Sequence, residues 1–219
     1  MFTGIEIGVI ELILYFSFCK FLSDLAIPLK LIPTLSYYWI MITILTGVWE
    51  AAFIFNYYEV SQISKNFINT SQHVWTRYYD ESYILPWKLS KIFYAEYGAY
   101  ADREYMSPMD NWSRVIESSH ALFCGLFSLI AVYKKIKEHH RDYDIFINVA
   151  MGSQLMNSIL YMARYFNTLD ERDSINFNWG GFPAGFALIK RPFMYVNIFW
   201  TIMPSYVIFK QIDRKIKNE

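Results

Sequence analysis

The sequence predicts an all-α membrane protein, a polytopic bundle of five transmembrane helices with an aromatic-rich cap between the second and third. Three observations predict this class. Of the 219 residues, 54% are hydrophobic and 20% are aromatic, whereas only 18% are charged. Charged residues make up about 25% of an ordinary soluble domain. The apolar residues also form runs of roughly 20, the length that a helix needs to cross a hydrocarbon core about 30 Å thick.

Five apolar runs reach this length. They cover about residues 5–25, 35–58, 112–133, 143–166 and 193–209. The first run is followed by Pro28 and Pro33, which stop a helix. It lacks the preceding basic segment of a cleaved signal peptide, so we expect it to be retained. The second opens with Tyr37, Tyr38 and Trp39, as in the aromatic belt at a membrane interface.

Residues 59–111, which we call the cap segment, separate the second and third predicted helices. The segment carries both signs of charge, Trp75, Trp87 and many tyrosines. It is too aromatic for a disordered linker, so we expect a folded cap at the membrane surface. Residues 167–189 contain Gly180, Gly181 and Pro183 and predict a loop. The length predicts one domain over residues 1–219.

Charge gives a predicted orientation. Twenty acidic and twenty basic side chains balance, so net charge gives no support for a nucleic-acid partner. Two basic clusters lie after the third and fifth predicted helices. Their members are Lys134, Lys135, Lys137, Arg141, Lys210, Arg214, Lys215 and Lys217. The positive-inside rule places both clusters and the C-terminus in the cytoplasm and the cap on the other side. Asn69 in Asn69-Thr70-Ser71 is then a glycosylation acceptor motif.

Two carboxyl groups lie at predicted membrane depth, Glu50 in the second helix and Glu117 in the third. A charge placed there costs about 2.5–3.5 kcal/mol even on the lenient insertion scale, so such groups normally face a bundle interior. Either one alone could be a protonated packing residue. Two on separate helices favour a functional site.

Other polar or polarisable side chains accompany these acids. They are His120 in the third helix, Gln154, Asn157 and Tyr161 along one stripe of the fourth, and Asn197 and Trp200 one turn apart in the fifth. Spacings of three and four residues place such side chains on one helix face. Taken singly, a histidine or tryptophan here is more often a packing residue. Cys19 and Cys124 lie inside apolar runs, which favours packing over a disulfide or a metal site.

These residue types suit acid–base chemistry on a lipid. A carboxyl group removed from water favours its neutral form, so one glutamate can hold a proton and donate it. The other can stabilise positive charge or take up a proton, and an indole face stabilises a cation. The set suits protonation of an alkene or an epoxide oxygen, followed by proton loss from a carbocation. We expect no metal and no cofactor, because the sequence offers neither three plausible metal ligands nor a phosphate-binding motif.

The order of these motifs resembles the emopamil-binding protein family, which includes the sterol Δ8–Δ7 isomerase of the endoplasmic reticulum. The similarity extends from about Tyr37 to Phe209. It rests on Glu50, the run from Tyr94 to Arg103, Val115-Ile116-Glu117, and Asn197-Ile198-Phe199-Trp200 with Pro204. The resemblance implies a five-helix bundle in the endoplasmic reticulum membrane that protonates a sterol double bond and removes a proton from a neighbouring carbon.

By the same resemblance, Glu50 and Glu117 match the family's two acidic catalytic positions. The ring of Trp200 matches the one that shelters positive charge in the family. We expect His120 to join the two acids in catalysis. The side chains expected to stabilise the substrate are Thr46, Asp102, Arg103, Gln154, Asn157, Tyr161, Asn197 and Trp200.

Two departures from the family pattern carry predictions of their own. The family has a histidine one turn before the first acid, where this chain has Thr46. We predict that His120, one turn after Glu117, supplies the missing group. The chain is also longer between Tyr58 and Glu96, with an insertion that contains Trp75. This insertion predicts a reshaped cavity mouth and a different lipid.

Three functions follow as hypotheses. The first is a cofactor-independent isomerase that acts on a sterol or triterpenoid. The second is a terpenoid or meroterpenoid cyclase that opens an epoxide or protonates an alkene in the same cavity. The third is a protein that binds sterols or cationic amphiphiles without turnover. Small residues, Gly47, Ala51 and Ala52, also suggest a homodimer, because they let helices approach closely.

Overall fold

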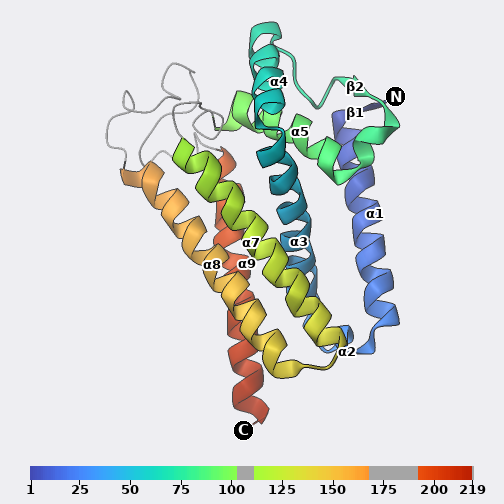
Figure 1. Ribbon diagram of the computed structural model, residues 1–219, viewed down its shortest axis with the longest axis vertical. Coiled ribbons are helices and arrows are strands. Elements are labelled where there is room, and N and C mark those ends of the chain that lie inside the picture. The colour runs from blue at the N-terminus through green and yellow to red at the C-terminus, as the bar shows by residue number, and fades with distance from the viewer. Residues whose placement is uncertain (103–110, 168–191, 219) are drawn as a thin grey trace.

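The computed structural model describes residues 1–102, 111–167 and 192–218, and nearly all of them are helical. Five long helices run lengthwise through the molecule (Figure 1). They are α1 (Gly4–Leu25), α3 (Thr34–Phe55), α7 (Asn111–Ile136), α8 (His140–Asn167) and α9 (Pro192–Asn218). Each matches one of the five predicted runs. The predicted loop after α8 lies almost wholly outside the described residues.

The largest difference in length is at the end of α9, which continues past the predicted limit at Phe209 to Asn218. The apolar pattern ends at Phe209, but the residues that follow include several lysines. Lysine is a good helix former, so the helix continues where the apolar run stops. The pattern therefore marks the apolar part of the helix and not the end of the helix itself.

Three helices are long and apolar enough to cross a membrane, when the described residues are considered. These segments are Thr34–Phe55, Arg114–Ile136 and His140–Ala163. α1 is apolar over most of its length but carries four charged side chains, Glu6, Glu11, Lys20 and Asp24. The sequence predicted five spans, and three helices qualify as candidates among the described residues. The structure therefore supports a helical membrane protein.

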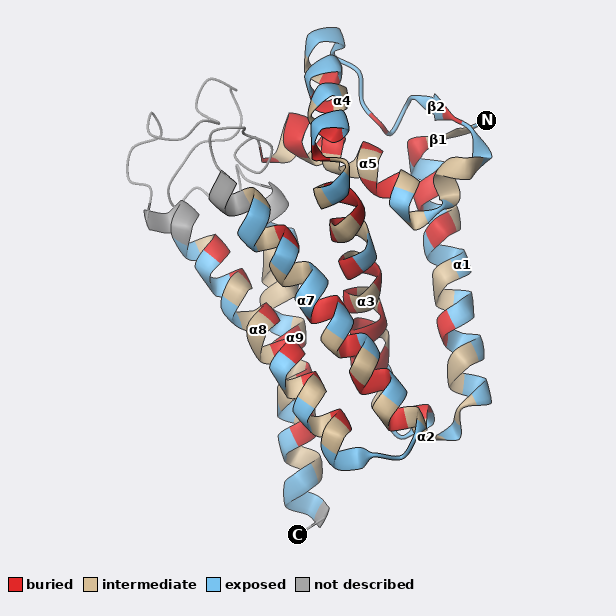
Figure 2. Ribbon diagram, viewed as in Figure 1, coloured by how far each residue is buried: buried red, intermediate tan, exposed pale blue. Residues whose placement is uncertain are grey.

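Two apolar cores hold the helices together. The first lies among α3, α7, α8 and α9, and its fully buried side chains include Ile40, Met41, Ile147, Met151 and Val207. The second joins the end of α3 to two shorter helices, α4 (Tyr57–Thr70) and α5 (Pro86–Glu96). Buried residues follow one another closely along α3, whereas much of α1 is exposed (Figure 2).

The described part of the cap segment is folded. Besides α4 and α5 it contains β2 (Tyr78–Tyr79) and two short helical turns, η1 (Glu81–Ile84) and η2 (Tyr97–Ala101). β2 pairs antiparallel with β1 (Phe2–Thr3), and Phe2 faces Tyr79. A short helix, α2 (Ile27–Lys30), turns the chain between α1 and α3 at the opposite end (Figure 1). Asn69 is exposed in the last turn of α4.

Within the cap segment, a buried carboxylate organises the chain. Glu96 accepts a hydrogen bond from the Val74 N–H at 2.9 Å, and its other oxygen lies 2.7 Å from His73 Nδ1. The His73 ring stacks on Tyr100, with centroids 4.0 Å apart. The residues before α5 are therefore tied to its C-terminal end.

α3 and α7 cross closely at two glycines. A Cβ atom added to Gly125 would lie 2.9 Å from the Gly47 Cα, and one added to Gly47 would lie 3.0 Å from the Gly125 Cα. Only glycine fits such a contact. Gly47 is buried at this contact, and Ala52 is also buried within the chain. Gly47 is therefore used for packing between two helices of one chain, and the homodimer stays a prediction.

Candidate functional site

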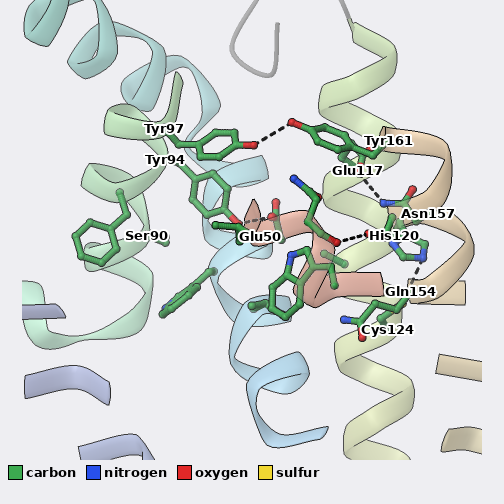
Figure 3. A pocket seen from close by; sticks show the side chains of 18 residues that line it. Glu50, Ser90, Tyr94, Tyr97, Glu117, His120, Cys124, Gln154, Asn157 and Tyr161 are labelled. Carbon is green, nitrogen blue, oxygen red and sulfur yellow. Dashed lines mark hydrogen bonds between the residues drawn. The ribbon is translucent and has the colours of Figure 1, made fainter. Parts of the chain in front are cut away.

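A cavity of about 300 Å³ lies between α3, α5, η2, α7, α8 and α9. This volume is at the lower end of the range for small-molecule pockets. Most side chains predicted as site residues border it. They are Thr46, Glu50, Glu117, His120, Gln154, Asn157, Tyr161, Asn197 and Trp200. The structure therefore brings together, around one space, residues from four separate long helices (Figure 3).

Glu50 is held by a phenol from the cap segment. The Tyr94 hydroxyl, on α5, donates a hydrogen bond to Glu50 Oε1. The Tyr94 ring stacks on Phe53 of α3, with centroids 4.8 Å apart and planes at 18°. Burial, and then the charge of Glu50, raise the pKa of Tyr94 well above its ordinary value. The phenol therefore keeps its proton and orients the carboxyl group of Glu50, which is only 8% exposed.

Glu117 is held in a different way. Asn157 Nδ2, on α8, donates to Glu117 Oε2 at 2.6 Å, and Figure 3 shows this pair beside the cavity. An amide cannot take up or release a proton under ordinary conditions. The two carboxyl groups thus border one cavity, one oriented by a phenol and the other by an amide.

A network of hydrogen bonds and ring contacts connects aromatic and amide side chains of α3, α8 and α9 next to the cavity. Trp39 Nε1 donates to Gln154 Oε1 at 2.9 Å, and Gln154 Nε2 donates to Thr43 Oγ1 at 3.3 Å. The Trp200 ring packs edge-to-face on Trp39, with centroids 4.5 Å apart. Because both partners of Trp39 border the cavity, this buried indole positions an amide and a second indole at once.

His120 borders the cavity, but its polar contacts lie toward α8. Its Nε2 atom is 2.8 Å from Ser153 Oγ and 3.4 Å from Cys124 Sγ. The Cys124 thiol also donates to the Ala150 carbonyl at 3.4 Å. Cys19 and Cys124 are both buried and free. The predicted replacement of the missing histidine by His120 is compatible with its place on the cavity wall and stays a prediction.

Asp102 lies behind the cavity wall and is fully buried. Tyr161 donates its hydroxyl proton to Asp102 Oδ2 at 2.5 Å, and the Tyr161 and Tyr97 hydroxyl oxygens are 2.9 Å apart. Asp102 is therefore linked to the cavity through Tyr161, and its predicted role in stabilising a substrate stays a prediction. Arg103, the remaining predicted site residue, lies outside the described residues.

Several residues near the cavity were not predicted from the sequence. Glu11 of α1 is 3% exposed and accepts a hydrogen bond from Trp49 Nε1 at 3.0 Å, while its Oε2 atom has no hydrogen-bond partner among the described residues. The position of Glu11 within an apolar run could have identified it as a candidate site residue, because ionisable groups in such runs are often functional. Trp49 borders the cavity, and its position next to Glu50 was a second signal.

The fold and this cavity define a class: a helical protein with membrane-spanning candidates that enclose a polar, ring-lined space. In the described parts of the chain, no group of three His, Cys, Asp or Glu side chains is arranged to hold a metal ion. The chain matches no protein-family model, and neither a curated protein nor a solved structure is significantly similar to it.

Proposed function

We propose that this chain is a cofactor-independent membrane isomerase that moves a double bond in a sterol or triterpenoid. The observation that carries the proposal is the convergence of Glu50 and Glu117, from α3 and α7, on one cavity bordered by Trp200 and Asn197. The resemblance of the motifs to the emopamil-binding protein family supports the same reaction. We therefore propose membership of that family as well.

The proposed bundle has five spans, with α1 and α9 beside the three candidate spans. The outward side chains of α1 and α9 are mainly large and apolar: Ile13, Leu14, Phe18 and Phe21 on α1, and Phe199, Ile202 and Phe209 on α9. Such side chains suit contact with lipid tails. Glu11, the charged group at mid-helix in α1, is buried, as a membrane helix requires.

The proposed orientation follows from the two ends of the molecule. The connection between α7 and α8 lies at the same end as the C-terminus, and the cap segment lies at the other (Figure 1). Both basic clusters are therefore together, which supports a cytoplasmic C-terminus. The cap segment then lies on the opposite membrane surface, and the resemblance indicates the endoplasmic reticulum.

The reaction needs one proton donor and one proton acceptor. One carboxyl group gives its proton to a carbon of the double bond, whose electron pair forms the new C–H bond and leaves a cation on the adjacent carbon. The other carboxylate removes a proton from a carbon next to the cation, and that C–H pair becomes the new double bond. The lipid gains one proton and loses one, so the balance needs no redox partner.

The cavity can stabilise the cation without trapping it. The indole face of Trp200 attracts positive charge, and the carboxylate that has lost its proton is a counter-ion in a site of low dielectric constant. Asn157 and Gln154 are held by Glu117 and Trp39 respectively. Neither amide is a base, so both can line the space without removing a proton from the cation at the wrong carbon.

The test is product analysis in D₂O with membranes that lack other sterol isomerases. A Δ8-sterol should give a product that carries one deuterium in wild-type membranes. Glu50→Gln and Glu117→Gln should each lower the rate at least about 100-fold. Glu59→Gln is the matched control, because Glu59 is an exposed carboxylate on α4 that pairs with Lys91 at 2.8 Å. This control should leave the rate unchanged.

Other outcomes would contradict the proposal in distinct ways. Cyclised products from an epoxy-prenyl substrate, with no sterol isomerisation, would indicate a cyclase in the same cavity. Retention of sterol with no product, in the wild type and in both glutamine variants, would indicate a binding protein without turnover.

A further inference from the structure

The proposed reaction leaves the two carboxyl groups in the wrong protonation states. After one turnover the donor has lost a proton and the acceptor holds one. Each must be reset before the next lipid can react. The inference that follows rests on the proposed function and concerns the groups that perform this reset.

Two phenols link the cavity to a third carboxyl group. Tyr97 of η2 and Tyr161 of α8 both border the cavity, with hydroxyl oxygens 2.9 Å apart. Tyr161 donates to Asp102 at 2.5 Å, and Asp102 is fully buried. The Asp102 N–H donates to the Tyr97 carbonyl at 2.8 Å, which fixes the carboxyl group relative to the first phenol. Figure 3 shows the Tyr97–Tyr161 pair above Glu50 and Glu117 in that view.

The charges around Tyr97 agree with this arrangement. Burial, followed by the charges of Asp102, Glu117 and Glu50, raises the pKa of the Tyr97 phenol well above its ordinary value. The phenol therefore lies within the electric field of all three carboxyl groups and stays neutral. A neutral hydroxyl group transfers protons by accepting one as it donates another, so no phenolate is needed.

We propose that Tyr97 and Tyr161 form a proton relay between the cavity carboxyl groups and Asp102, which stores the proton between turnovers. The protonated acceptor gives its proton to the Tyr97 oxygen as the Tyr97 proton moves to Tyr161. The Tyr161 proton moves to Asp102, whose carboxylate becomes neutral. The reverse sequence delivers a proton to the carboxylate of the donor. No covalent bond other than O–H bonds forms or breaks.

The relay predicts a difference between the first turnover and later ones. The first turnover uses a proton that the donor already holds, so it does not need the relay. Tyr97→Phe removes the hydroxyl group that exchanges protons with the cavity carboxyl groups and leaves the Tyr161–Asp102 hydrogen bond in place. It should leave the rate of the first turnover within about twofold of the wild type and slow steady-state turnover at least about tenfold. Asp102→Asn, which cannot store the proton, should give the same pattern.

Rapid-quench measurements with a Δ8-sterol, at enzyme excess and then at substrate excess, separate the two phases. Tyr100→Phe is the matched control, because Tyr100 lies in the same turn but donates to the Phe67 and Gln72 carbonyls, away from the cavity. It should change neither phase. Equal slowing of both phases in Tyr97→Phe and Asp102→Asn, or slowing of neither, would overturn the relay. A wild type without product in the first turnover would instead overturn the proposed function.

Discussion

The same four helices, α3, α7, α8 and α9, are packed in two contrasting ways along their length. Toward α2 they enclose an apolar core in which Ile40, Ile147 and Met151 are fully buried. Toward the cap segment they separate around the cavity that contains Glu50 and Glu117. We call these regions the packed half and the cavity half.

The comparison shows how one bundle supports both stability and a polar site. In the packed half, close contacts between apolar side chains hold the helices. In the cavity half, the two carboxyl groups receive hydrogen bonds, one from Tyr94 and one from Asn157, because an unpaired buried acceptor would be costly. The free energy of folding therefore comes from different interactions in the two halves. The predictions below test this division.

The largest effect is expected at the contact between α3 and α7, beside the cavity. Gly125→Ala would place its Cβ 2.9 Å from backbone, whereas a Cβ on Gly152 would meet nothing within 4 Å. We expect Gly125→Ala to lower the free energy of unfolding by about 3 kcal/mol, in the upper range for overpacking. Gly152→Ala should lower it by much less. Thermal unfolding in detergent compares the two; equal melting temperatures would refute the tight contact.

A smaller loss is expected in the packed half. Ile147→Ala removes a fully buried side chain from the apolar core and should cost about 2 kcal/mol, the lower limit for such truncations. Only packing is lost, because the unfolded helices also lie in lipid. Val196→Ala, at a 56% exposed position on the cavity wall, should be nearly neutral. Equal losses in the free energy of unfolding for Ile147→Ala and Val196→Ala would show that the packed half and the cavity half do not differ in packing.

A loss of stability smaller than that of Ile147→Ala is expected when a polar group beside the cavity loses its hydrogen-bond partner. Glu11→Leu leaves the Trp49 N–H without its acceptor and should cost about 1 kcal/mol, as for a typical hydrogen bond. Glu11→Gln keeps an oxygen acceptor and should restore most of the loss. Thermal unfolding and tryptophan emission would follow both variants. A glutamine variant as unstable as the leucine variant would show that the hydrogen bond is not the cause.

The smallest effects are expected at ion pairs outside both halves. Arg214 lies 2.5 Å from Asp144, which is only 15% exposed, so Arg214→Ala should lower the free energy of unfolding by about 0.5–1 kcal/mol. Lys20 and Asp24 are both at least half exposed, and Lys20→Ala should leave the melting temperature unchanged. A larger loss of stability in Lys20→Ala than in Arg214→Ala would contradict the expectation that the less exposed ion pair is the stronger one.

The apolar pattern was sufficient to predict the positions of the long helices, because each buries or exposes a continuous apolar surface. Spacing within a helix also predicted that Gln154 and Asn157 share a face, and both border the cavity. The pairing of Glu50 with Tyr94 could not be predicted, because residues far apart in sequence meet only through the packing of α5 on α3. The close approach of Gly47 to Gly125 could not be predicted for the same reason, since the two glycines lie on different helices.

The small sheet at the start of the chain has a consequence for assembly. Phe2 and Thr3 pair with Tyr79 and Tyr78, and the Gly4 N–H donates to the Arg77 carbonyl at 3.1 Å. During synthesis these partners emerge only after α3 has been made. β1 therefore stays unpaired until β2 has been made, so the first helix is joined to the rest of the fold at this end only late in synthesis.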